Sequence, residues 1–141
     1  MKRLLISILA IGAFTVTFAQ NDSTIFKGRI DNDEYSVYIN MDFYKNNITI
    51  PGQDILGEMP GYFGDNKDGR KWMIVDAEID KTGRKAQLSI INDYGSEDLT
   101  ATLSLNNDNT FTLEQVDGST LKIARNRKWV KMPKKLLFRK K

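Results

Sequence analysis

The chain has 141 residues, with 21 Lys and Arg, 18 Asp and Glu, and a formal net charge of +3. It contains no Cys and no His. Without Cys there is no disulfide framework and no thiol for lipid attachment, so a hydrophobic core has to stabilise the fold alone. Without either residue type, Ser-His and Cys-His catalysis are excluded and the preferred ligands of zinc, copper and iron are absent. We therefore expect no catalytic motif, no metal site and no cofactor.

The N-terminal residues have the layout of a secretory signal peptide. Lys2 and Arg3 precede an apolar stretch over 4–18, and the sequence Thr-Phe-Ala then places small residues three and one positions before a cleavage site. The stretch is shorter than the roughly 20 residues that span a bilayer, so a retained anchor is the weaker alternative. We expect removal of residues 1–19 and a single exported domain over 20–141, periplasmic or secreted, with no transmembrane segment.

Apolar residues alternate with polar ones through most of the expected domain. In the longest run, Tyr35–Tyr44, every second residue from Tyr35 to Phe43 shares one mostly aliphatic face, which predicts a strand. The same alternation predicts strands at Met73/Val75/Ala77/Ile79, Ala86/Leu88/Ile90, Leu99/Ala101/Leu103/Leu105, Phe111/Leu113 and Leu121/Ile123, and shorter apolar runs predict strands at Thr24–Ile30, Ile48–Pro51 and Leu136–Arg139.

Pairs of turn-forming residues separate these runs. They are Asp31-Asn32, Asn46-Asn47, Asp68-Gly69, Thr82-Gly83, Tyr94-Gly95, Asn106-Asn107 and Asp117-Gly118. About eight to ten strands, spaced roughly 8–12 residues apart, are typical of an antiparallel barrel or sandwich. We favour an all-β, up-and-down meander closed into a barrel, because short hairpins place consecutive strands side by side and closure removes exposed edges. A β-sandwich is the alternative, and no helix longer than one turn is expected beyond the signal peptide.

The segment Pro51–Arg70 interrupts this rhythm. It contains five glycines and two prolines, yet it also carries the apolar residues Ile55, Leu56, Met59, Tyr62 and Phe63. Glycine permits positive φ and close backbone approach, whereas the aromatic residues need burial. We expect either a bent strand packed on the core or a lid over a pocket.

Within this segment, Gly57-Glu58-Met59-Pro60-Gly61-Tyr62-Phe63-Gly64 is followed by hairpin strands at Leu99–Leu105 and Thr110–Val116. This arrangement resembles small uncharacterised secreted proteins of Gram-negative gut bacteria, which have a Tyr-Leu-Pro-Tyr-Phe-Gly-like segment ahead of a run of hairpins. Gly61 stands where those proteins have an aromatic residue. The resemblance covers about half of the expected domain and implies a lipocalin-like β-barrel with an internal cavity, without implying an activity or a catalytic residue.

Charge is divided unevenly along the chain. Residues 20–120 contain 9 basic and 18 acidic residues, whereas residues 121–141 contain 10 basic residues and no acidic ones. In one interpretation the basic strands pair with acidic strands of the same sheet. In the other they form a patch for an anionic partner such as lipopolysaccharide or a sulfated glycan. The patch would include Arg125, Arg127, Lys128, Lys131, Lys134 and Lys135, followed by Arg139, Lys140 and Lys141; few aromatic residues lie among them, so no nucleic acid is expected.

Amphipathic aromatic residues mixed with amides are typical of a pocket for a polar ligand such as a glycan. The candidates for ligand binding are Tyr38, Asn40, Tyr44, Tyr62, Phe63, Trp72 and Trp129. Packing in the core or at its rim is the alternative role for each of the aromatic residues. The face that points inward decides between a packed core and a cavity.

Asp76, Glu78 and Asp80 alternate on one predicted strand, at a spacing that overlaps the carboxyl separation of inverting glycosidases. Alternating acids more often form the solvated face of a strand. The Asp- and Asn-rich turns do not match a calcium-binding loop, because Tyr35 and Lys67 occupy positions that require oxygen ligands.

Taken together, these patterns predict an exported, non-enzymatic β-barrel that binds a small ligand, a glycan or an envelope protein. The alternative is a protein-interaction or inhibitor module that uses the basic C-terminal strands, and a carboxylate-dependent glycoside hydrolase is the remote alternative.

Overall fold

The computed structural model describes residues 24–92 and 95–141, so the expected signal peptide lies outside the described residues. Strands dominate these described residues, and the longest helical element among them is a 3₁₀ turn at Asp54–Leu56. The strands are β2 (Lys27–Asn32), β3 (Val37–Asp42), β4 (Ile48–Thr49), β5 (Glu58–Met59), β6 (Gly61–Asp65), β7 (Asp68–Ile79), β8 (Lys85–Asn92), β9 (Asp98–Leu105), β10 (Thr110–Gly118), β11 (Lys122–Arg125), β12 (Lys128–Lys131) and β13 (Lys135–Lys140).

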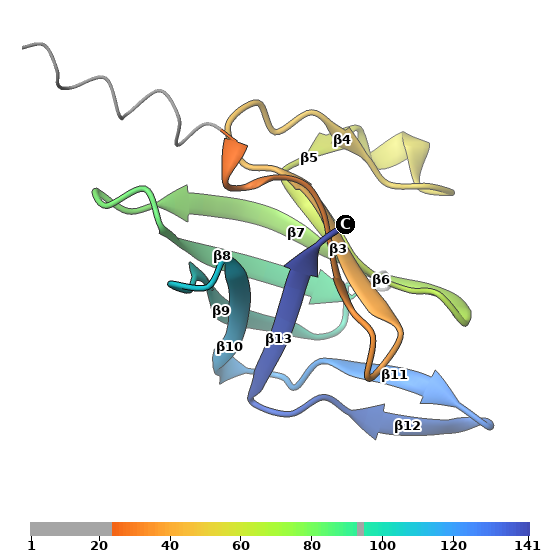
Figure 1. Cartoon of the computed structure of the whole chain (residues 1–141). Coiled ribbons are helices and arrows are strands. Elements are labelled where there is room, and N and C mark those ends of the chain that lie inside the picture. The colour runs from red at the N-terminus through yellow and green to blue at the C-terminus, as the bar shows by residue number, and fades with distance from the viewer. Residues whose placement is uncertain (1–23, 93–94) are drawn as a thin grey trace, which may run out of the picture.

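Eight strands form a closed antiparallel barrel in the order β10-β13-β2-β3-β6-β7-β8-β9 (Figure 1). Barrel strands that follow one another along the chain are neighbours in the sheet, and β13 closes the ring against β2. Two small hairpins interrupt the meander, β4–β5 after β3 and β11–β12 after β10. They lie at opposite ends of the barrel, and the end with β11–β12 is called the lower end here (Figure 1). The prediction of a closed up-and-down barrel is confirmed.

The aliphatic face of the barrel points inward. Val37, Ile39 and Met41 of β3 are buried in a large hydrophobic cluster, as the alternation predicts. The same cluster contains phenylalanines from distant parts of the chain, including Phe26 and Phe111, whose rings lie 6.1 Å apart. The interior is therefore filled by side chains, and a ligand site has to be sought at the ends or on the outside of the barrel.

The face predicted for β7 is only partly correct. Trp72 and Ile74 pack in the core instead of Met73, because a bulge between Ile74 and Asp76 shifts the register against β8. Val75, the residue within the bulge, is 37% exposed. Beyond it the alternation returns to the predicted phase, since Ala77 and Ile79 contact the core. One extra residue in a strand reverses the faces on either side of it.

Met73 belongs to a second hydrophobic cluster on the outer surface of the barrel. Its buried members are Ile50, Tyr62 and Met73, and Tyr38 and Met59 pack against them. Ile48 and Met59 of the β4–β5 hairpin pack against this cluster. A side chain facing away from the barrel interior is therefore not necessarily exposed to solvent.

The glycine-rich segment divides into two parts. Its second part forms β6, in which Gly61 through Gly64 are buried and a register irregularity follows Phe63, so the prediction of a bent strand is confirmed there. A β-carbon on Gly61 would collide with the carbonyl oxygen of Asn40, so this position requires glycine. Its first part is an exposed loop in which Ile55 is 94% exposed.

Several predicted turns lie within strands instead. Asp31-Asn32 and Asp117-Gly118 end β2 and β10, and Asp68-Gly69 begins β7. A short strand at β12 was not predicted, because Lys128-Trp129-Val130-Lys131 has no alternation of apolar and polar residues. Tyr94 of another predicted turn lies outside the described residues.

Candidate binding site at the lower end of the barrel

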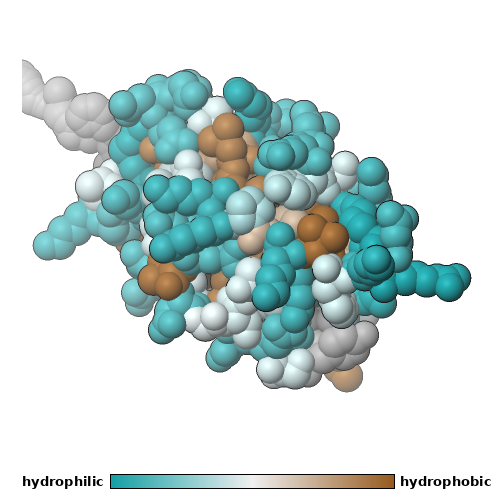
Figure 2. All heavy atoms as spheres, turned by 90° about the horizontal axis from the view of Figure 1, so that it is seen from below, coloured by the Kyte–Doolittle hydropathy of each residue, from teal (hydrophilic) through white to brown (hydrophobic). Residues whose placement is uncertain are grey.

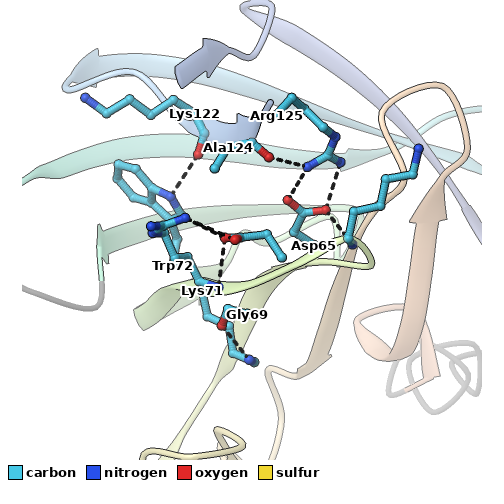
Figure 3. Close-up of polar contacts among 10 residues, drawn as sticks. Asp65, Gly69, Lys71, Trp72, Lys122, Ala124 and Arg125 are labelled. Carbon is cyan, nitrogen blue, oxygen red and sulfur yellow. Dashed lines mark hydrogen bonds and ion pairs between the residues drawn. The ribbon is translucent and has the colours of Figure 1, made fainter. Parts of the chain in front are cut away.

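The β11–β12 hairpin is fixed to the barrel by specific polar contacts at two points (Figure 3). The indole Nε1 of Trp72 donates to the carbonyl oxygen of Lys122 at 3.3 Å. The guanidinium of Arg125 donates to both carboxylate oxygens of Asp65, at 2.6 and 2.8 Å, and to the carbonyl oxygen of Tyr35 at 2.8 Å. The hydrogen bond to Asp65 is the main reason that the pKa of Arg125 is raised.

Apolar contacts reinforce these anchors. Ile123 of β11 is buried in the main core and Val130 of β12 packs against it. The two residues are cross-strand partners, so they share the face of the hairpin that covers the barrel interior. The hairpin is thus held as a rigid extension of the barrel.

A pocket of about 130 Å³ lies between this hairpin and the lower ends of β7 and β8. Its lining residues are Arg70, Lys71, Trp72, Asn92, Ser96, Glu97, Lys122 and Trp129. Trp129 is 56% exposed, and its ring lies 5.2 Å from Cζ of Arg70 and 5.7 Å from Nζ of Lys122. An indole with cations near its ring and open surface beside it can stack on a ligand and attract negative charge.

The polar groups of the pocket are held in place by local contacts. Asn92 donates to the hydroxyl oxygen of Ser96 at 3.1 Å and accepts from the backbone amide of Ser96 at 2.9 Å. Glu97 forms an ion pair with Lys122 at 3.0 Å, and Arg70 forms one with Asp68 at 3.0 Å. These contacts orient amide, hydroxyl and charged groups before any ligand arrives.

The structure separates the predicted ligand-binding residues into distinct places. Trp72 and Trp129 meet at the pocket, and Phe63 is the cross-strand partner of Trp72 within the core. Tyr38 and Tyr62 contact one another on the outer surface, with ring centroids 5.8 Å apart.

The two remaining ligand-binding candidates lie elsewhere. Asn40 is half-buried on β3, where its register partners are Arg29 and Tyr62. The hydroxyl of Tyr44 accepts a hydrogen bond from the backbone amide of Phe26 at 3.0 Å. The structure therefore brings only Trp72 and Trp129 of the candidates to the pocket.

The predicted basic patch is divided as well. Arg125 is paired with Asp65, and Lys135 on β13 faces Glu114 on β10, as the interpretation of paired strands expects. Lys134 lies in the connection before β13, where its carbonyl oxygen accepts from the Gln115 amide. The exposed residues Arg127, Lys128 and Lys131 form no ion pair with any residue in 24–92 or 95–141.

The three alternating carboxylates from Asp76 to Asp80 face solvent. Asp76 and Glu78 are exposed, and Asp80 caps a turn by accepting from the hydroxyl of Thr82 at 2.5 Å, which lowers the pKa of Asp80. Among the described residues, no group of three or more His, Cys, Asp or Glu is placed to hold a metal ion.

No helix in the described part of the chain is long and apolar enough to cross a membrane. Seen from below, the molecule is mostly hydrophilic, and its hydrophobic residues form separate small patches (Figure 2).

Six pocket residues were not singled out from the sequence. They are Arg70, Lys71, Asn92, Ser96, Glu97 and Lys122. They belong to β7, β8, β11 and the turn after β8, and they meet only when the hairpin folds back under the barrel. Of these residues, only Lys122 could have been linked to the site from the sequence, since it belongs to the basic region that contains Trp129.

Comparison with protein-family models, with curated proteins and with solved structures finds no match. The function therefore has to be inferred from the site itself.

Proposed function

We propose that this chain is an exported, non-enzymatic β-barrel that binds a small ligand or a glycan in the pocket beside Trp129. The observation that carries the proposal is the exposure of this indole on a hairpin that is otherwise anchored by buried contacts. Trp129 is 56% exposed, whereas its neighbour in the pocket, Trp72, is buried. An exposed tryptophan at the rim of a preformed pocket is a common anchor for binding.

The composition of the pocket supports a polar ligand with a flat face. The Trp129 ring supplies a stacking surface. The Ser96 hydroxyl accepts from Asn92, and its own hydrogen has no acceptor among the described residues, so it can donate to a ligand. A sugar ring offers both an apolar face and hydroxyl groups, which matches these two features.

The barrel interior is a poor alternative for the same role. Its inward-facing side chains form a continuous core in which Phe63, Phe111 and Phe138 are almost fully buried. A ligand of sugar size would have to displace that core. The lower end, by contrast, offers a pocket that is already open.

The test is a fluorescence titration of the purified domain with a panel of oligosaccharides. Binding should change the tryptophan emission, and the Trp129→Ala variant should lose at least about tenfold in affinity, which corresponds to one good aromatic contact. Ile55→Ala is the matched control, because Ile55 is a 94% exposed hydrophobic residue on the loop next to the β4–β5 hairpin. Unchanged emission and unchanged melting temperature across the panel would overturn the proposal. The mass of the product recovered from the expressing cell tests export, since cleavage removes residues 1–19.

A second candidate is a protein-interaction module, and one observation favours it. Among the strands that the structure describes, β12 pairs only with β11, so its other edge carries backbone groups that an extended segment of another protein can pair with. Capture of a defined partner that is lost when Lys128 and Lys131 become glutamate would support this candidate. Capture that persists would exclude the basic edge as its contact.

A further inference from the structure

The pairing register of the hairpin bears on the chemical class of the ligand, an inference that rests on the proposed function. In this register Lys122 lies directly opposite Lys131, and Arg125 lies opposite Lys128. Like charges at directly opposed positions of an antiparallel pair destabilise it. β13, which is equally basic, avoids this arrangement: Lys135 lies opposite Glu114.

The barrel supplies an acidic partner to one member of each like-charged pair, which reduces the repulsion within the pair without removing it. Glu97 forms an ion pair with Lys122 and Asp65 forms one with Arg125. The other members, Lys128 and Lys131, are exposed and have no acidic partner within the described residues. Both lie on β12, the outer strand of the hairpin.

Only one of these two lysines shares a face with the exposed tryptophan. Side chains of a strand alternate between its faces, so Trp129 and Lys131 lie on one face, about 7 Å apart, and Lys128 lies on the other. Lys122 is on the same face as Trp129, because it is the cross-strand partner of Lys131, and its Nζ is 5.7 Å from the indole ring. Lys131 is therefore an exposed cation on the face of the stacking surface, and it forms no ion pair with any residue that the structure describes.

Further cations approach the indole from the barrel. Arg70 lies 5.2 Å from the ring of Trp129, and Lys71 is the next residue in the lining of the pocket. Glu97 is the single acidic residue in that lining. Arg70 is paired with Asp68 and Lys122 with Glu97, whereas Lys71 forms no ion pair among the described residues. This unbalanced positive charge gives the pocket an affinity for anions.

We propose that the ligand is an acidic glycan, whose sugar ring stacks on Trp129 and whose sulfate or carboxylate group contacts Lys131. Binding places a negative charge beside Lys131 and relieves its repulsion of Lys122. Lys131 thus determines specificity for an anionic ligand over a neutral one. In the free protein Lys131 faces the like charge of Lys122, and the negative charge of the ligand compensates this repulsion.

The test compares three probes on the full domain in 0.15 M salt: a heparin-derived sulfated hexasaccharide, neutral maltohexaose and hexaglutamate. The sulfated probe should bind at least about tenfold more tightly than maltohexaose, and Lys131→Glu should remove that preference. Lys128→Glu is the matched control, since it changes the net charge equally on the opposite face. Its effect should stay below about threefold, because charges are screened over about 8 Å at this salt concentration.

A second measurement separates specificity from a purely structural role. Without ligand, Lys131→Glu should raise the melting temperature, because an opposite charge then faces Lys122. The same variant should no longer be stabilised by the sulfated probe. Gained stability together with lost binding is the signature of a residue retained for recognition.

The outcomes distinguish the two proposals. Equal binding of the sulfated and neutral probes, lost in Trp129→Ala, would overturn the acidic ligand and leave the proposed function intact. Equal losses in Lys131→Glu and Lys128→Glu would also overturn it, since they indicate unspecific charge attraction. If hexaglutamate binds with the same affinity as the sulfated probe, and if Trp129→Ala does not weaken that binding, the ligand is an acidic protein segment and not a glycan. Failure of every probe to bind would overturn the proposed function itself.

Discussion

The guanidinium of Arg125 donates to both carboxylate oxygens of Asp65, which is only 4% exposed, across 60 residues of chain. This pair joins β11 to the barrel strand β6. It positions the hairpin that carries Trp129, so a residue of the basic C-terminal region acts here as an anchor. The candidate site therefore depends on an ion pair that lies outside the pocket.

Replacing Arg125 by methionine should lower the free energy of unfolding by about 2–3 kcal/mol, because it leaves the buried Asp65 carboxylate without its cationic partner and with only the backbone amide of Lys67 as a donor among the described residues. Arg125 is 22% exposed, so the loss is smaller than for a fully buried pair. Urea denaturation measures the change. Lys128→Met is the control, since Lys128 lies opposite Arg125 and has no acidic partner in the described chain; its removal should cost nothing.

The double variant Arg125→Met, Asp65→Asn should recover part of the loss, because both charges are then absent from the buried position. A single variant Arg125→Met that unfolds like the wild type would show that the contacts of Ile123, Trp72 and Lys122 are enough to hold the hairpin.

Much of the fold follows from the period of two in the sequence, and its limits have a physical cause. The alternation from Val37 to Met41 predicts the inward face of β3 correctly. It fails at Met73, because the bulge at Val75 depends on pairing with β8, which no local pattern contains. It also misses β12, whose four residues form a strand only because they pair with β11.

The candidate site was less accessible to sequence analysis than the fold. Trp72 and Trp129 could be named as candidates, yet their proximity is produced by the hairpin folding under the barrel. The role of Arg125 was hidden because Asp65 stands far from it in the chain. The residue types in the sequence predicted that aromatic side chains would bind a ligand. Which of these side chains lie together in one pocket depends on tertiary packing.

Two glycines on neighbouring strands should respond differently to substitution by alanine. Gly61→Ala should destabilise the barrel by about 1–3 kcal/mol, because its β-carbon would meet backbone atoms of Asn40 and Met41 that cannot move aside. Gly69→Ala should be neutral or slightly stabilising, since nothing lies within 4 Å of its β-carbon position. Thermal unfolding of the two variants provides the measurement. Equal effects at both positions would contradict the close packing of β3 against β6.

Tyr38 should make stability depend on pH in the alkaline range. Burial first, and hydrogen bonding with Tyr62 second, raise its pKa from 10.0 to about 12. The unfolded chain then loses the phenolic proton at lower pH than the folded chain, so stability falls as the pH rises from 10 to about 12 and is unaffected below that range. Because Tyr38 is partly exposed, the loss should not exceed about 1 kcal/mol.

The measurement is denaturant unfolding at several pH values for the wild type and Tyr38→Phe. The free energy of unfolding of the variant should lack the alkaline decline that the Tyr38 phenol contributes. Its absorbance at alkaline pH should also lack the ionisation step of this phenol near pH 12. In a contrary result, the wild-type absorbance would show the Tyr38 step at the ordinary tyrosine pKa, and Tyr38→Phe would lack a step of that amplitude there. This result would contradict the burial of the Tyr38 ring against Tyr62.

The turn of the β11–β12 hairpin provides the last prediction. Asn126 and Arg127 have φ values of 53° and 64°, so both residues are left-handed, as a two-residue hairpin turn of type I′ requires. Glycine is favoured at the second of these positions, and an arginine there costs stability. Arg127→Gly should therefore raise the free energy of unfolding by about 0.5–1 kcal/mol, measured by urea denaturation. Arg127→Ala is the control, because it removes the same charge and keeps the unfavourable φ; equal stability of the two variants would show that charge, and not backbone conformation, sets the stability of this turn.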